Sequence, residues 1–168
     1  MSTRKLSLIG PAIGEKLVKQ LGHELKNHNL YKSFANFFGL EGITALEKYY
    51  NKRAEEELHH SEWIHNFLTD ADYAVKYPVV EYNTESWVDY LDPFKLTVDR
   101  EIQTTQMIYS IYEMAQQEKD YMTCVWLYNF LLKEQIEEEN TSRMALTIME
   151  LDADLLEKAE QVKELLTY

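Results

Sequence analysis

Four glutamates and one histidine have the residue types and the spacing that indicate metal chemistry. The glutamates are Glu24, Glu57, Glu101 and Glu138. Each interrupts a stripe of mostly apolar and aromatic residues at three- and four-residue spacing, which marks the face that a helix turns to a bundle core. His60 follows Glu57 by three residues and therefore shares its helical face. Carboxylate oxygens with one imidazole nitrogen suit iron or manganese better than a metal that prefers sulfur.

Long helices are predicted to carry these residues. All five glycines lie between Gly10 and Gly42, and only Pro78 and Pro93 interrupt the rest of the sequence. We expect helices over about 11–38, 43–68, 88–117 and 121–150, and a shorter amphipathic helix over 154–166. No linker or repeat divides the chain, so residues 1–168 are predicted to form one all-α domain.

The lengths of the connections predict the topology. The first and second helices, and the third and fourth, are joined by short turns, so each pair is expected to be antiparallel. The connection between the second and third helices is far longer than a usual helix–helix turn, and its Tyr77-Pro78-Val79-Val80 segment has no helical period. It is long enough to return along the bundle, which would make these two helices parallel. The sequence therefore predicts a four-helix bundle with one long crossover.

The positions of the glutamates along their helices predict that they meet. Glu24 and Glu57 are each 15 residues from the turn that joins their helices, or about 22 Å along the helix axis. Glu101 and Glu138 are similarly matched around the second short turn, so all four carboxylates are expected at one level. Four buried carboxylates repel one another and lose their hydration. Protonation would relieve part of this cost, and two divalent cations would neutralise all four charges.

Several other polar residues are interpreted without a ligand role. Glu55 and Glu139 belong to acidic runs and are expected on solvated helix faces. The histidines that fall off the core stripes, and are expected at the surface, are His23, His28, His59 and His65. Arg53 lies on the core stripe of the second helix, where it would be a counter-charge to the carboxylates.

The composition argues against some classes of function. The formal net charge of −12 is poorly suited to binding nucleic acid. No apolar run reaches the roughly 18–20 residues that cross a bilayer, and the amino-terminal apolar stretch is too short for a signal peptide. Cys124 is the only cysteine, so neither a disulfide framework nor a cysteine-based zinc site is expected. We therefore expect a cytoplasmic protein with no nucleic-acid or membrane partner.

From about Ile13 to Leu151 the sequence resembles the bacterial non-haem ferritins. The matching segments are His23-Glu24-Leu25 with Tyr31, the run from Ala54 to His60, Glu101, and the run from Glu134 to Glu139. The resemblance implies a ferritin-like bundle with a di-iron centre. One iron would be held by Glu24, Glu57 and His60. The second would be held by Glu57, Glu101 and Glu138, with Glu57 as the bridge.

The same resemblance assigns further residues and a function. Gln135 would lie beside the second iron, and Tyr31 matches the site tyrosine of these ferritins. An accessory third iron site would be formed by Glu56, Glu134 and Glu137 together with Glu138. Such a centre would oxidise Fe²⁺ with O₂ or H₂O₂, and the ferric product would be stored in a closed shell of twenty-four subunits.

Three differences between this sequence and related families narrow the expected type of protein. The fourth helix carries Gln135-x-x-Glu138 rather than a second Glu-x-x-His, which favours a ferritin over a bacterioferritin or a rubrerythrin. Bacterioferritins place their haem-ligand methionine directly after the bridging glutamate, where this chain has Leu58, so we expect no haem. The segment from Leu151 to Asp154 lacks the glycine of the usual turn before the fifth helix. We expect a tight turn there, with a straight continuation of the fourth helix as the alternative.

Two other classes of function remain open from the sequence. A di-metal enzyme of the peroxidase, manganese catalase or rubrerythrin type would keep the same site without a storage cavity. A metal-free helical interaction protein would keep the bundle and bind no ion at these carboxylates. The first alternative differs from a ferritin in its assembly, and the second differs in its metal content.

Overall fold

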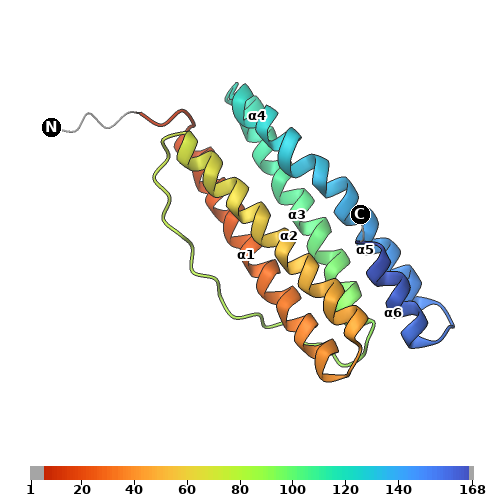
Figure 1. Cartoon of the computed structure of the whole chain (residues 1–168). Coiled ribbons are helices and arrows are strands. Elements are labelled where there is room, and N and C mark those ends of the chain that lie inside the picture. Colours follow the sequence, from red (N-terminus) through yellow and green to blue (C-terminus); the bar gives the residue numbers. More distant parts are fainter. Residues whose placement is uncertain (1–5, 167–168) are drawn as a thin grey trace.

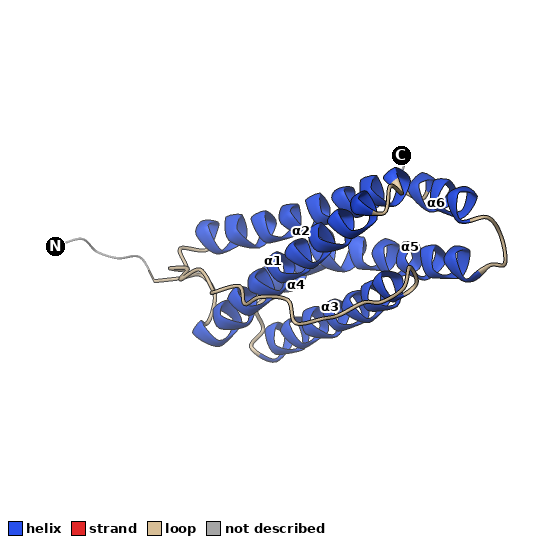
Figure 2. Cartoon of the chain, turned by 90° about the horizontal axis from the view of Figure 1, so that it is seen from below, coloured by secondary structure: helices blue, strands red, loops and turns tan. Residues whose placement is uncertain are grey.

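The breaker-free stretches of the sequence form long helices. The computed structural model describes residues 6–166, in which the α-helices are α1 (Pro11–Leu40), α2 (Thr44–Asp70), α3 (Asp92–Gln117), α4 (Tyr121–Leu127), α5 (Lys133–Glu150) and α6 (Leu155–Glu164). A π-helical segment, η1 (Tyr128–Leu132), joins α4 to α5, so these three elements form one long helix. Figures 1 and 2 show the long helices side by side, which confirms the predicted all-α bundle. Across residues 6–166, no helix combines the length and the apolar character needed to span a bilayer.

The connections set the topology of the bundle. α1 and α2 form an antiparallel hairpin, and the turn between them contains Gly42 with a φ of +74°, a conformation that glycine adopts without strain. The connection from Ala71 to Leu91 then runs along the bundle to its opposite end, as Figure 1 shows in yellow-green. α2 and α3 are therefore parallel, and the predicted crossover is confirmed.

The crossover lies close against α1 and delays the start of α3. A Cβ atom at Gly14 would overlap the ring of Tyr73, so the absence of a side chain permits this close approach. α3 begins at Asp92, four residues later than the sequence predicts. The reason is a local turn, in which the Asp89 carboxylate accepts hydrogen bonds from the backbone N–H groups of Leu91 and Asp92.

The segment η1 changes the spacing of the buried positions locally in the fourth long helix. A π turn contains one residue more than an α turn, so a position beside it need not follow α-helical spacing. The three- and four-residue spacing that connects Cys124, Leu131 and Glu138 predicts Tyr128 on the same core stripe. Tyr128 is instead 63% exposed, and Leu127 is buried. This prediction is wrong because the sequence spacing was that of a continuous α-helix. Beyond η1 the predicted stripe holds, and both Gln135 and Glu138 are buried.

Two apolar clusters fill the two ends of the bundle. One is rich in aromatic rings, including those of Tyr31, Phe34, Phe38, Tyr49, Tyr50 and Phe94. The other is mostly aliphatic and includes Ile13, Leu17, Leu21, Ile64, Leu68, Ile108 and Leu127. Between these clusters lies a buried polar layer that contains the predicted glutamates. Close packing at both ends fixes the helices on which those glutamates are mounted.

The carboxy-terminal segment folds back onto the bundle. The chain leaves α5 through an extended Leu151, and Asp154 caps α6 by accepting hydrogen bonds from the backbone N–H groups of Leu156 and Glu157. α6 packs against α2 and α5 (Figure 1). Its buried face consists of Ala159, Val162 and Leu166. The expected turn is therefore present even though it contains no glycine.

The cap of α6 generates a stability prediction. Asp154→Ala is expected to lower the free energy of unfolding by about 1 kcal/mol, because two backbone N–H groups lose their acceptor. Thermal unfolding measures this loss, and faster hydrogen exchange of the α6 amides locates it. Asp152→Ala is the matched control, since Asp152 is exposed and makes no side-chain hydrogen bond within residues 6–166. Equal effects of the two substitutions would show that the cap does not hold α6.

Candidate metal centre

The long helices bring the predicted ligands to the middle of the bundle. The ligands are Glu24 from α1, Glu57 and His60 from α2, Glu101 from α3, and Glu138 from α5. All five side chains are buried, with exposed fractions between 0% and 6%. Glu24, Glu57 and His60 each place one potential ligand atom within 4.8 Å of the others. These three residues form the Glu–His cluster.

Glu101 and Glu138 both lie beside Arg53, and Oε1 of Glu138 also lies 3.6 Å from Nε2 of His60. The guanidinium of the buried Arg53 places Nη2 2.5 Å from Oε1 of Glu101 and Nη1 3.7 Å from Oε1 of Glu138. Burial disfavours the charge on Arg53, but Glu101 and Glu138 raise its pKa well above the usual value, so it stays protonated. Among residues 6–166, neither Glu101 nor Glu138 places an oxygen within 4.8 Å of the ligand atoms of all three members of the Glu–His cluster. Arg53 is therefore a counter-charge inside the site, as its place on the core stripe suggests.

Hydrogen bonds satisfy some of the buried carboxylate oxygens. Both oxygens of Glu101 accept, because Tyr31 Oη donates to Oε1 at 2.6 Å and Gln135 Nε2 donates to Oε2 at 3.0 Å. Gln20 Nε2 donates to Oε1 of Glu24 at 2.6 Å. Among the carboxylate oxygens of this centre, Oε2 of Glu24, both oxygens of Glu57 and Oε2 of Glu138 are buried without a hydrogen-bond partner in residues 6–166. Unpaired buried oxygens are costly, and a cation bound by them would remove that cost.

Burial and mutual repulsion change the protonation of the centre. Burial raises the pKa of Glu24 to about 7, although its neighbours Glu57 and Gln20 lower it. Burial, followed by the charge on Glu101, raises the pKa values of Glu57 and Glu138 well above the ordinary range. Burial lowers the pKa of His60 to about 4, so its imidazole is neutral near pH 7 and offers a lone pair to a metal. A cation entering the centre would therefore displace protons from the carboxylates.

A cavity of about 160 Å³ adjoins the centre between α2, α5 and the residue Leu166 that follows α6. Its lining residues are Arg53, Glu56, His60, Glu134, Glu137, Glu138, Thr141 and Leu166. The glutamates expected at an accessory metal site therefore surround one space, which is called here the acidic cavity. Leu166 forms part of its wall from just beyond α6, a contact that no spacing in the sequence indicates.

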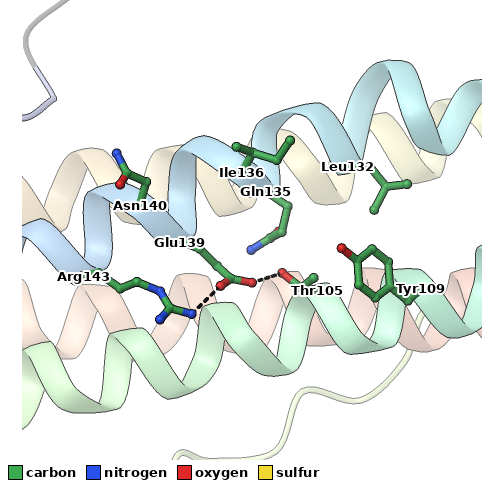
Figure 3. A pocket seen from close by; sticks show the side chains of 8 residues that line it. All are labelled: Thr105, Tyr109, Leu132, Gln135, Ile136, Glu139, Asn140 and Arg143. Atoms are coloured by element: carbon green, nitrogen blue, oxygen red, sulfur yellow. Dashed lines mark hydrogen bonds and ion pairs between the residues drawn. The ribbon is translucent and has the colours of Figure 1, made fainter.

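A larger cavity of about 370 Å³ lies between α3 and α5 (Figure 3). Gln135 lines it and also donates to Glu101, so this amide is shared by the cavity and the centre. Glu139 lies in the same cavity, where it accepts from Thr105 at 2.5 Å and pairs with Arg143 at 2.8 Å. Thr105 and Arg143 thus supply partners to the Glu139 carboxylate inside this cavity.

Two buried polar residues of α1 differ from the sequence interpretation. His23, predicted at the surface, is 8% exposed, and its Nε2 lies 2.7 Å from Oγ1 of Thr104 on α3. That prediction is wrong because α1 packs against both α2 and α3, so more than one of its faces is buried. Gln20 has no predicted role. Its position one turn before Glu24, on the same helical face, is the signal that could have found it.

Comparison with known proteins identifies the family. The ferritin-like domain model matches residues 14–151. The chain belongs to the ferritin family. It is 29% identical to the bacterial non-heme ferritin of Staphylococcus aureus (strain USA300) over 126 residues, which cover 75% of each chain. It is 31% identical to that of Staphylococcus epidermidis over 130 residues, which cover 74% of this chain and 75% of the relative.

Solved structures agree with this assignment. An open-pore ferritin from the hyperthermophilic archaeon Archaeoglobus fulgidus superposes with a TM-score of 0.88 at 28% identity, covering 97% of this chain and all of that chain. A closed form of the same archaeal ferritin, engineered by mutagenesis, gives a TM-score of 0.86 at 27% identity, with coverage of 95% and 98%. The protein is thus a ferritin-family iron-storage protein whose buried Glu–His cluster is consistent with a ferroxidase site.

The protonation of the centre generates a prediction about pH. The metal-free protein is expected to lose stability as the pH rises from about 6 to about 7.5, through the folded pKa of Glu24. Glu24, Glu57 and Glu138 have raised pKa values in the folded state, so over this range the folded state binds more protons than the unfolded state. Their contribution to stability is lost as the pH rises through the folded pKa, about 7 for Glu24. His23 and His60 offset this loss only in part: their folded pKa values are lowered to about 4, so below about pH 7 the unfolded state binds more protons at these two sites than the folded state does.

Melting temperatures in the presence of a chelator measure this effect. Glu24→Gln should flatten the dependence on pH, because it removes one of the titrating groups. Glu55→Gln is the control on an exposed face of α2 and should keep the parental slope. A melting temperature that stays constant or rises between these pH values would contradict the raised pKa values.

Proposed function

We propose that this protein oxidises Fe²⁺ at the buried centre with O₂ or H₂O₂ and stores the ferric product inside a shell of identical subunits. The observation that carries this proposal is the convergence of four buried carboxylates and a neutral imidazole, several of whose oxygens lack a protein partner. Anionic oxygens attract Fe³⁺ more strongly than Fe²⁺, because the Coulomb energy grows with the charge of the ion. Such a site therefore favours the loss of an electron from bound Fe²⁺.

The ligands would divide between two ions of substrate. The first Fe²⁺ would be held by the Glu–His cluster, where one imidazole nitrogen joins oxygens of Glu24 and Glu57. The second would be held by Glu57, Glu101 and Glu138, with Glu57 bridging the two ions. The short distances within the Glu–His cluster support the first position. The burial of Glu101 and Glu138 beside it supports the second.

Tyr31 and Gln135 would position Glu101 at this centre. Each donates a hydrogen bond to one of its oxygens, at 2.6 Å and 3.0 Å respectively. Burial raises the pKa of Tyr31 well above that of an ordinary tyrosine, so its phenol remains a hydrogen-bond donor near neutral pH. We assign the accessory third position to the acidic cavity, where Glu56, Glu134 and Glu137 lie beside Glu138.

Removal of the bridging carboxylate tests the proposed oxidation. Glu57→Ala should slow the oxidation of Fe²⁺ in air by roughly tenfold or more, because both ion positions lose a ligand. Stopped-flow absorbance of the ferric product, recorded at stoichiometric Fe²⁺, measures the rate. Glu55→Ala, on an exposed face of the same helix, should oxidise iron at the parental rate. Parental activity in Glu57→Ala would place the oxidation elsewhere.

A closed twenty-four-subunit shell is the assembly that we propose for storage. The chain exposes large apolar side chains that a monomer would leave in water, and those on the crossover include Val79, Tyr82 and Val88, each at least 90% exposed. Several exposed apolar side chains on one segment are typical of a contact between subunits. We place this assembly in the reducing cytoplasm that the single cysteine suggests.

Light scattering after size-exclusion chromatography tests the assembly. Aerobic iron loading should give a particle of about twenty-four chain masses that carries the ferric product. The double change Val79→Asp and Tyr82→Asp should shift the protein to smaller species, whereas Thr84→Asp in the same connection should not, because it adds a charge without removing an apolar contact. A protein that remains dimeric with and without iron would favour a soluble di-metal enzyme over a storage protein.

A further inference from the structure

A protein cation already lies in one half of the candidate centre. Arg53 is 1% exposed, and its guanidinium contacts Glu101 at 2.5 Å and Glu138 at 3.7 Å. Nη2 of the same group donates to Oγ of Ser142 at 3.2 Å, and Nη1 lies 3.4 Å from Oε2 of Glu56. Glu101 and Glu138 are the carboxylates that would hold the second iron ion of the proposed function.

The two halves of the centre therefore differ in what they can accept. In the Glu–His cluster, both oxygens of Glu57 and one oxygen of Glu24 lack a hydrogen-bond partner within residues 6–166. Glu101, in contrast, accepts hydrogen bonds at both of its oxygens, and one of its donors is Arg53. A first divalent ion can bind at the Glu–His cluster without breaking an ion pair of Arg53, whereas a second ion cannot.

We infer that Arg53 is a placeholder for the second metal ion, so that the centre loads in two unequal steps. This role of Arg53 rests on the proposed function, and it adds an order in which the two metal ions bind. The first ion binds at the Glu–His cluster while Arg53 stays between Glu101 and Glu138. The second ion binds only when the guanidinium leaves that position.

The charges of the centre support this sequence of events. When Glu24, Glu57, Glu101 and Glu138 are ionised, one divalent ion and the guanidinium together neutralise three of the four negative charges. Replacement of the guanidinium by a second divalent ion neutralises the fourth. The guanidinium stabilises the metal-free centre more than the centre with two ions bound. Without it and without metal, Glu101 and Glu138 would repel each other in a low-dielectric interior.

The acidic cavity offers the displaced side chain a new position. Arg53 itself lines this space, which is about 160 Å³, and Nη1 already approaches Glu56. Glu134 and Glu137 line the same cavity, so the guanidinium can keep a carboxylate partner after it leaves Glu101. In that position Arg53 would compete with a metal ion at the accessory position, because both need the same carboxylates.

Anaerobic titration with Co²⁺ alone measures the two steps directly, by calorimetry on the full chain. The parent should bind one ion per subunit tightly and a second about a hundredfold or more weakly, because the second must break a buried ion pair. Arg53→Gln should bind two ions with similar affinity. Arg53→Lys keeps the charge and should retain the weak second step. Arg143→Gln is the matched control on the exposed face of α5 and should behave as the parent does.

Anomalous diffraction from crystals that hold one equivalent of Co²⁺ locates the ions, and it needs no substitution. One ion is expected at the Glu–His cluster, with Arg53 still between Glu101 and Glu138. Equal occupancy of both positions in the parent, or an unchanged second affinity in a folded Arg53→Gln protein, would overturn the placeholder and leave the proposed function standing. Absence of Co²⁺ from the Glu–His cluster would overturn the proposed function, and the placeholder with it.

Discussion

The burial of negative charge in the bundle core is the constraint on which the rest of this structure depends. Glu24, Glu57, Glu101 and Glu138 lie in an interior where ionised groups lose their hydration and repel one another strongly. The chain reduces this cost by holding protons on some of the carboxylates and by placing Arg53 beside two of them. A metal ion that binds here would replace both the protons and the guanidinium, because it supplies positive charge to the carboxylates.

The fold serves this constraint by fixing the backbone on both sides of the polar layer. An aromatic cluster fills one end of the bundle and an aliphatic cluster fills the other, so the helices cannot move apart to hydrate the carboxylates. The long crossover makes α2 and α3 parallel and lets Glu57 and Glu101 meet at the same depth. The electrostatic cost of these buried carboxylates, and with it the cation binding that we propose, therefore depends on packing that is remote from the site.

The carboxy-terminal helix extends this dependence to the surface of the subunit. α6 packs against α2 and α5, and Leu166 beyond its end lines the acidic cavity together with Arg53 and Glu56. The backbone carbonyl of Leu166 also accepts a hydrogen bond from Lys52, one residue before Arg53 in α2. The packing of the tail and the environment of the buried arginine are thus coupled through a few side chains.

The sequence alone determined the helices, the crossover and the level at which the glutamates lie. These features follow from local rules, because breakers end helices, residue spacing selects a buried face, and loop length limits topology. The family resemblance added the expected roles of Gln135 and Tyr31, whose hydrogen bonds to Glu101 the structure displays. The division of those ligands between ions remains a proposal.

Only the tertiary structure decided how the charges are paired. Arg53 has a long side chain, and its position on the core stripe does not say whether it faces the Glu–His cluster, Glu101 or solvent; contacts from α3 and α5 make that choice. The burial of His23 and the exposure of Tyr128 were likewise decided elsewhere, by the packing of α3 and by the π turn of η1. The physical reason is the same in each case. Helical spacing reports one helix at a time, whereas the energy of a buried polar side chain depends on residues from several helices at once.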